Sequence, residues 1–226
     1  MKQHLIRAAA AALLVGAVSA AQAVPTLAFV VDSGAPVFCA DGDSCDANGA
    51  SGAVTFVGAL GAFSVNVTTG LSKPVLTGGN PLMDLNSVDV VATADALEVH
   101  TLGILFSDTD FDRFNSQISG DFGGTLNSGP GASVQAVAYV DAGNNLFVGV
   151  PVGLIGPFGP GAYSGSFLDG PSPGAPYAVT QLIFLTTQGS TTYSGDFVVN
   201  VPEPTTLALL GLGLLGLGAG WRRRAA

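Results

Sequence analysis

The sequence predicts an all-β protein: an antiparallel β-sandwich, jelly-roll-like, that spans residues 24–200 between two distinctive terminal segments. Three observations favour this fold. Of the 226 residues, 32 are glycine and 13 are proline, and only 10% are charged, which is typical of many short strands joined by tight turns. Hydrophobic and polar residues alternate in the central part, as in strands with one buried face. Convincing amphipathic helices are absent between the terminal segments, so helical crossovers are not expected.

Nine segments are predicted to be strands from their alternation or their β-branched content. In chain order they are Thr26–Val31, Ala53–Val57, Phe63–Val67, Ser87–Thr93, Leu97–Phe106, Ser133–Val140, Leu146–Val150, Ala178–Thr187 and Tyr193–Asn200. Clusters of glycine, proline and asparagine separate them and predict turns, as at Thr77–Pro81, Asn127–Gly131 and Gly170–Gly174. No fixed-period repeat is present, which disfavours a solenoid.

Residues 1–23 contain the three parts of a secretory signal peptide. Lys2 and Arg7 make a positive start, a short apolar run follows, and Ala21 and Ala23 frame a small-x-small cleavage site. The apolar run, expected to be a signal helix, is too short to span a bilayer permanently. We expect signal peptidase to cut so that the mature chain starts at Val24; an uncleaved N-terminal anchor is the alternative.

Residues 201–226 form a tail in three parts. Pro202, Glu203 and Pro204 come first, and the two prolines stop the preceding strand and hold an extended, accessible segment. From Thr205 to Trp221 a Gly- and Leu-rich run of 17 residues would make a single transmembrane helix of about 26 Å, the lower limit for a bilayer span. The arginines that follow it are Arg222, Arg223 and Arg224. By the positive-inside rule they anchor the C-terminus in the cytoplasm and leave the folded domain outside.

This order of Pro-Glu-Pro, Gly/Leu-rich helix and arginine cluster closely resembles the PEP-CTERM sorting signal, which is also described as the C-terminal segment of ice-binding proteins. The resemblance implies recognition by an exosortase, a membrane transpeptidase, and processing near Pro202-Glu203-Pro204. It also implies a cell envelope that makes exopolysaccharide. The alternative, an ordinary tail anchor, explains the helix and the arginines but not the Pro-Glu-Pro.

The stretch from Leu82 to Asn200 is also similar to an all-β region that precedes such tails. The likeness rests on segments such as Phe106–Phe111 and Tyr139–Phe147. It supports the predicted fold and implies no biochemical activity.

The charges are distributed unevenly along the chain. Five of the seven basic residues are terminal, and all 16 acidic residues lie between Asp32 and Glu203. That stretch holds Lys73 and Arg113 against 16 acids, so its net charge is 2 − 16 = −14. Such a surface repels phosphate backbones, which excludes nucleic acid as a partner.

Cys39 and Cys45 are the two cysteines of the chain. In an exported protein they are expected to form a disulfide that closes a small loop. Metal ligation by the cysteines is disfavoured, because His100 is the one histidine of the mature chain and it lies in a predicted strand.

Two clusters of aspartates are candidates for binding calcium, because calcium favours several hard oxygen ligands. The first cluster is Asp41, Asp43 and Asp46, and the second is Asp108, Asp110 and Asp112. Neither has the glycine or the final acidic residue of an EF-hand loop, and solvated acidic loops are the competing interpretation.

No catalytic constellation is found in the sequence. Glu98 and Glu203 are the two glutamates, no Gly-x-Ser-x-Gly elbow accompanies His100, and paired carboxylates meet only in space. Aromatic residues in a Gly/Pro-rich stretch are candidates to stack sugars from loops, against the usual fate of core packing. They are Phe158, Tyr163, Phe167 and Tyr177.

The sequence therefore predicts an exported protein with no catalytic activity of its own. It is expected to be anchored in the inner membrane before processing and then to reach the cell surface or the extracellular matrix. The expected partners are signal peptidase and the secretion machinery, an exosortase, the membrane and exopolysaccharide. The alternatives are a secreted polysaccharide-active hydrolase and a calcium-dependent carbohydrate-binding or adhesion module.

Overall fold

The structure, a computed structural model, describes residues 24–76, 83–93, 98–111, 117–129, 131–171 and 173–200. The predicted signal peptide, transmembrane helix and arginine cluster lie outside these residues. Within the described part of the chain, no helix is long and apolar enough to cross a membrane.

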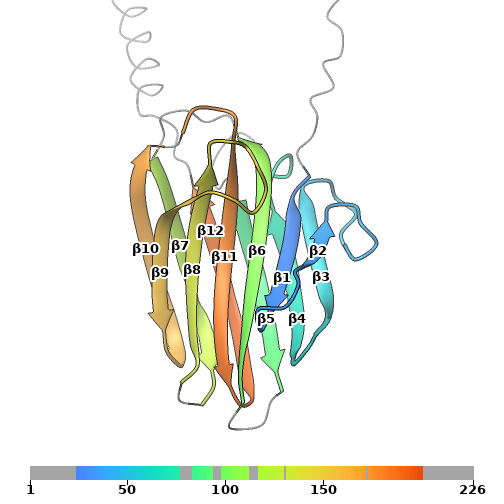
Figure 1. The fold of residues 1–226 in the computed structure, drawn as a ribbon, viewed down its shortest axis with the longest axis vertical. Coiled ribbons are helices and arrows are strands. Elements are labelled where there is room, and N and C mark those ends of the chain that lie inside the picture. Colours follow the sequence, from blue (N-terminus) through green and yellow to red (C-terminus); the bar gives the residue numbers. More distant parts are fainter. Residues whose placement is uncertain are drawn as a thin grey trace, which may run out of the picture.

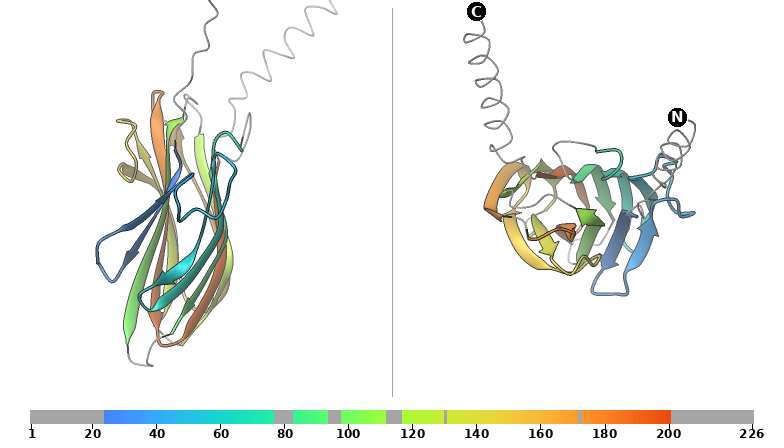
Figure 2. Two further views of the ribbon diagram at one scale, coloured as in Figure 1. Left: turned by 90° about the vertical axis from the view of Figure 1, so that its right-hand side faces the viewer. Right: turned by 90° about the horizontal axis from the view of Figure 1, so that it is seen from above.

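Twelve strands form two sheets that pack face to face (Figures 1 and 2). Sheet A contains, in spatial order, β2 (Val37–Ala40), β1 (Thr26–Val31), β6 (Val99–Phe111), β11 (Tyr177–Gln188), β8 (Ser133–Asp141) and β9 (Val150–Phe158). Sheet B contains β10 (Gly161–Pro171), β7 (Gln117–Asn127), β12 (Thr191–Asn200), β5 (Met83–Ala92), β4 (Phe63–Leu71) and β3 (Ala53–Leu60). The described pairs of neighbouring strands are antiparallel, which confirms the predicted all-β sandwich.

The strand order confirms the predicted jelly-roll topology. The last eight strands make two halves of four, β5-β12-β7-β10 and β6-β11-β8-β9, so the chain repeatedly crosses from one sheet to the other. This double Greek-key arrangement is that of a jelly roll. The hairpin of β1 and β2 extends sheet A beyond β6, and the hairpin of β3 and β4 extends sheet B beyond β5.

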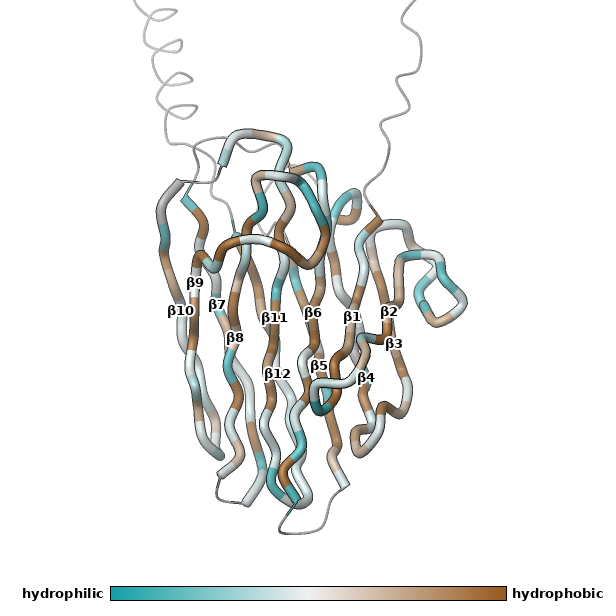
Figure 3. The backbone as a smooth tube through the Cα atoms, viewed as in Figure 1, coloured by the Kyte–Doolittle hydropathy of each residue, from teal (hydrophilic) through white to brown (hydrophobic). Residues whose placement is uncertain are grey.

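The inward faces of the two sheets supply one core. Along β12, buried and exposed residues alternate as expected for a strand with one face inside. The largest fully buried side chains include Phe29, Phe63, Phe106, Phe122 and Phe197. The buried hydrophobic cluster runs from Leu27 to Val199, so residues 24–200 contain this core and both sheets. In Figure 3 many residues along the strands are hydrophobic, whereas the loop between β2 and β3 is largely hydrophilic.

Glycines inside strands leave room for aromatic rings of the core. A Cβ atom at Gly120 of β7 or at Gly153 of β9 would lie 2.3 Å from the ring of Phe167 on β10. A Cβ atom at Gly165 of β10 would lie 2.5 Å from the side chain of Ile155. Glycine in a strand often marks such a close approach. These strands therefore contain several glycines, and in a sequence glycine normally predicts a turn.

The chain enters and leaves the sandwich at the same end. β1 begins and β12 ends at the upper end of Figure 1, which we call the tail end. The start of β7 lies beside the last residue of β12, because Ser119 pairs with Asn200. The opposite end, where β1 runs into Asp32, is called the far end.

Candidate functional site

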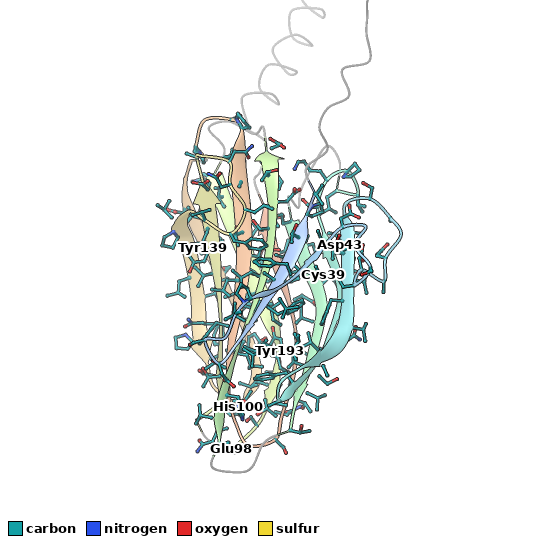
Figure 4. All side chains as sticks on the ribbon, turned by 45° about the vertical axis from the view of Figure 1, so that its right-hand side comes forward. Cys39, Asp43, Glu98, His100, Tyr139 and Tyr193 are labelled. Atoms are coloured by element: carbon teal, nitrogen blue, oxygen red, sulfur yellow. A yellow bond between two sulfur atoms is a disulfide. The ribbon has the colours of Figure 1, made fainter. Side chains whose placement is uncertain are left out.

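The predicted disulfide is present near the tail end. Cys39 on β2 is bonded to Cys45, with their Cα atoms 5.8 Å apart, and Cys39 is fully buried. Closing so short a loop stabilises the fold by about 2 kcal/mol in the chain-entropy model. The bond fixes the acidic loop that follows β2 against the core (Figure 4).

The carboxylates of that loop are occupied by backbone N–H groups. Asp46 accepts hydrogen bonds from the N–H groups of Asn48 and Thr55 on Oδ1, both at 2.8 Å, and from Gly42 on Oδ2. Asp43 accepts from the N–H of Ala40 at 3.1 Å, and Asp41 accepts from the N–H of Gly52 at 2.6 Å. These bonds shape the loop, which is what Asp residues commonly do in turns.

The second acidic cluster is split between the interior and the surface. Asp108 is fully buried, whereas the backbone N–H and Oδ1 of Asp110 are hydrogen-bonded to the side chain of Asn144 on the exposed β8–β9 loop. Asp112 lies outside the described residues. The carboxylates of Asp108 and Asp110 do not point to a common site. The reason is a β-bulge: β6 contains an extra residue opposite Tyr177–Val179, and Asp110 has a φ of 60°. That bulge breaks the alternation that would place both side chains on one face.

Buried Asp108 is paired with Lys73, the partner that the sequence does not reveal. The Lys73 Nζ lies 2.9 Å from Asp108 Oδ2, donates to the carbonyl oxygen of Thr109, and sits 4.1 Å from the centre of the Phe111 ring. Ser72 donates to the same carboxylate oxygen at 2.6 Å, and the N–H of Thr109 donates to Oδ1 at 2.8 Å. This arrangement joins the end of β4 in sheet B to β6 in sheet A.

His100 forms an ion-pair site at the far end (Figure 4). Its Nδ1 lies 2.7 Å from Asp32 Oδ2, and its Nε2 lies 3.6 Å from Glu98 Oε2. The hydrogen bond to Asp32 is the main cause that raises the pKa of His100. Burial alone would raise the pKa of Asp32, but hydrogen bonds from the N–H of Thr101 and from His100 outweigh it and lower that pKa.

We expect the far end to lose stability as the pH rises above neutrality. Because the folded pKa of His100 exceeds the ordinary 6.5, the stabilisation is complete below about pH 6.5 and is lost as the pH rises through the raised pKa. The lowered pKa of Asp32 sets the acid limit: its contribution persists above about pH 4 and disappears below the folded pKa. Thermal unfolding from about pH 6 to pH 9 should show a larger decrease in Tm for the parent than for His100→Gln. Equal slopes would contradict the ion pair.

The aromatic residues considered as candidates to stack sugars from loops are part of the packed strands. Tyr177 is fully buried, and Phe158 and Tyr163 stack with ring centres 5.0 Å apart while packing against Phe122. Burial raises the pKa of Tyr163 to about 12, so its phenol stays protonated at neutral pH. Core packing, the competing interpretation, is the one that the structure supports.

The outward face of sheet B is polar and acidic. It contains a shallow depression of about 170 Å³, lined in part by Asp89, Thr125, Asn127, Thr192 and Ser194. Carboxylate, amide and hydroxyl groups of this kind can exchange hydrogen bonds with the hydroxyl groups of sugars. Val90, Val91 and Tyr193 complete its lining, so polar groups rim a partly apolar floor.

A second, mostly apolar cavity of about 420 Å³ opens at the tail end between β7, β8 and β9. Asp141 is the acidic residue among its described lining, and hydrogen bonds from the backbone and side chain of Asn145 lower the pKa of that carboxyl. The described lining supplies no nucleophile beside a base. Among the described residues, no group of three or more His, Cys, Asp or Glu side chains is arranged to hold a metal ion.

The last strand of the sandwich runs directly into a sorting sequence. A family model for the PEP-CTERM protein-sorting motif matches residues 200–224, beginning at the residue where β12 ends. The chain carries a PEP-CTERM motif. The PEP-CTERM motif implies export, anchoring in the membrane through the C-terminus before processing, and processing by an exosortase. The individual predicted processing residues, Pro202, Glu203 and Pro204, lie outside the described residues.

Solved structures give only weak likenesses to the domain that precedes the PEP-CTERM motif. TmCBM61 in complex with beta-1,4-galactotriose has a TM-score of 0.34 and 10% identity, covering 62% of this chain and 82% of that one. TmCBM27, a carbohydrate-binding module with specific mannan recognition, has a TM-score of 0.27 and 9% identity, covering 66% and 84%. The enzymatically active domain of tailspike protein 4 of bacteriophage CBA120 has a TM-score of 0.28 and 12% identity, covering 62% and 19%. Scores this low indicate neither a common fold nor a common function. The comparison with curated proteins gave no significant match.

Proposed function

We propose that this chain is an exosortase-sorted envelope protein whose jelly-roll domain serves as a non-catalytic module of the exopolysaccharide matrix. The observation that carries the proposal is the position of the PEP-CTERM motif, which starts at residue 200 directly after the last strand. The core described above lies within residues 27–199, so removal of the tail leaves both sheets intact.

The polar groups of the domain support a binding role over a catalytic one. The carboxylates of the first acidic loop accept backbone hydrogen bonds, Asp108 is paired with Lys73, and His100 lies between the carboxylates of Asp32 and Glu98. The polar outward face of sheet B, with its shallow depression, is the surface we assign to contact with matrix polysaccharide. The signal-peptidase product is expected to start at Val24, which is exposed at the start of the sandwich.

The decisive experiment is intact and C-terminal peptide mass spectrometry of the protein from its native host, with and without the exosortase. We expect a mature form that begins at Val24 and ends near Pro202-Glu203-Pro204, and we expect it only when the exosortase is present. An intact tail through Ala226 in both strains would mean a simple membrane anchor and would remove the main support for the proposal.

The non-catalytic part of the proposal has its own test. The purified mature domain, incubated with polysaccharide from the host, is expected to sediment with the polymer and to release no new reducing ends. Release of reducing ends that depends on the domain's carboxylates would establish the hydrolase alternative instead.

A further inference from the structure

β3 is an edge strand whose own sequence gives it no protection against pairing with another chain. Sheet B ends at β3, which has β4 as its one neighbour among the described strands. The eight residues of Ala53–Leu60 include neither a charged residue nor a proline. An uncharged segment of this length, rich in β-forming residues and placed at a sheet edge, is a template for strand addition and aggregation.

The other three edge strands are protected by features of their own. β2 has only four residues, and a strand this short offers little to pair with. β9 contains Pro151 and Pro157, which remove backbone donors. β10 carries the exposed carboxylate of Asp169. β3 is therefore the edge that needs protection from another part of the chain.

The register of the β3–β4 hairpin fixes which backbone groups of β3 face the free edge. Leu60 and Phe63 face each other across a two-residue turn, so Leu60 directs its N–H and C=O groups toward β4. Because this direction alternates along a strand, Gly58 and Phe56 do the same. The residues between them direct their N–H and C=O groups away from the sheet. They are Ala53, Thr55, Val57 and Ala59.

The loop between β2 and β3 occupies two of those four positions. The N–H of Thr55 donates to Asp46 Oδ1 at 2.8 Å, and the carbonyl oxygen of Thr55 accepts from the N–H of Ala47 at 2.8 Å. The N–H of Ala53 donates to the carbonyl oxygen of Ala50 at 3.1 Å. The first half of the free edge is thus hydrogen-bonded within the chain.

Two covalent and polar links hold this segment in place, and we call residues 41–50 the edge loop. The disulfide between Cys39 and Cys45 ties the edge loop to β2, where Cys39 is fully buried in the core. Asp41 accepts a hydrogen bond at 2.6 Å from the N–H of Gly52, the residue immediately before β3. The edge loop is therefore fixed at both of its ends, next to the strand that it covers.

The edge loop also brings charge to an edge strand that has none. Asp41, Asp43 and Asp46 all belong to it. Two copies approaching edge to edge bring these like charges toward each other, which opposes pairing. The part of the edge left open contains Val57 and Ala59, and these two residues are fewer than the roughly three that the shortest strands contain.

We propose that the edge loop protects β3 from a second copy of this chain, and that without this loop the domain assembles by pairing one β3 with another. A second copy is the partner because every copy presents the same uncharged strand. Two such strands related by a two-fold axis run antiparallel and can exchange hydrogen bonds along their free edges. The disulfide and the first acidic cluster thus have a common role, which is to keep the exported domain monomeric.

Sedimentation velocity of residues 24–200, which contain both sheets and their core, tests the proposal across protein concentrations. We expect the parent to be monomeric. Cys39→Ala combined with Cys45→Ala should strengthen self-association at least about tenfold, and so should Asp46→Ala, which leaves the disulfide intact. A factor of about ten corresponds to one hydrogen bond to a charged group that a partner strand no longer has to displace.

A lysine placed on β3 tests whether the association uses this edge. Val57 is 65% exposed on β3, and Val57→Lys added to Asp46→Ala should return the protein to the monomer, because a lysine on an edge strand opposes pairing. Val91→Lys is the matched control. Val91 is 46% exposed on β5, an interior strand of the same sheet, so this change should leave the association of Asp46→Ala unaltered.

Circular dichroism and urea unfolding show whether each variant is folded, and Asp46→Ala carries the test if the cysteine variant is not. Hydrogen exchange at the amide of Val57 gives a local readout, since we expect it to slow only in variants that associate. The proposal is overturned if Asp46→Ala is as monomeric as the parent, or if the parent associates as strongly as its variants. Association that Val57→Lys leaves unchanged, or that Val91→Lys abolishes equally, overturns it as well.

Discussion

Replacing Lys73 with Met is expected to lower the free energy of unfolding by about 3 kcal/mol, because it leaves a fully buried carboxylate without its counter-charge. Asp108 has no exposed side-chain area, and its remaining described partners are the Ser72 hydroxyl and the N–H of Thr109. The change also removes the ammonium from above the Phe111 ring. Met keeps most of the aliphatic stem, so the measured loss reports mainly the charge. Urea unfolding at neutral pH is the appropriate measurement.

Two further variants separate this explanation from a general loss of packing. Asp108→Asn combined with Lys73→Met removes both charges, and we expect it to recover part of the lost stability relative to Lys73→Met alone. Asp121→Asn, on the exposed face of sheet B, should change the free energy of unfolding by less than about 0.5 kcal/mol. A Lys73→Met protein as stable as the parent would show that the ion pair contributes nothing to the fold.

The second large effect is expected at Gly124, on the inward face of β7. A Cβ atom there would lie 2.2 Å from the carbonyl oxygen of Ser194 and 2.7 Å from the Cα of Gly195. These are backbone atoms of β12, so no side-chain rotation can make room and the strands must move apart. We expect Gly124→Ala to cost about 3 kcal/mol, at the upper end for added core volume. Thermal and urea unfolding both measure it.

The neighbouring glycine is a matched control. A Cβ atom at Gly123 would lie 3.5 Å from the nearest atom, the carbonyl oxygen of Tyr163, which is ordinary contact. Gly123→Ala is therefore expected to be neutral or stabilising, because alanine loses less backbone entropy than glycine on folding. If the two variants were equally destabilised, the close approach of β7 and β12 would not be the cause.

Local patterns were predictable from the sequence, and contacts between distant segments were not. The alternation of Ala178–Thr187 and Tyr193–Asn200 indicates β11 and β12, and the short spacing of Cys39 and Cys45 indicates their disulfide. The tail motif is likewise a contiguous pattern. In contrast, Lys73 and Asp108 are 35 residues apart, and nothing local marks their pairing.

The strands that the sequence analysis missed have identifiable physical causes. β7 and β10 are rich in glycine because aromatic rings lie against their inward faces, as Phe167 does at Gly120, and glycine normally indicates a turn. β2 has only four residues, and its Val37 and Phe38 are both exposed. The predicted strand Leu146–Val150 is wrong, since this stretch is the loop before β9 and Phe147 there has a φ of 60°.

The place where β12 leaves the sandwich determines how the domain responds to mechanical tension. β12 is an interior strand of sheet B, hydrogen-bonded to β5 on one side and to β7 on the other, and its last residue is the attachment point of the tail. A pull on the tail runs along the strand, perpendicular to those hydrogen bonds. The hydrogen bonds to β5 and to β7 then resist the load together in shear, and they do not open one at a time. A domain tethered in this way resists detachment by flow better than one tethered through an edge strand such as β2 or β10.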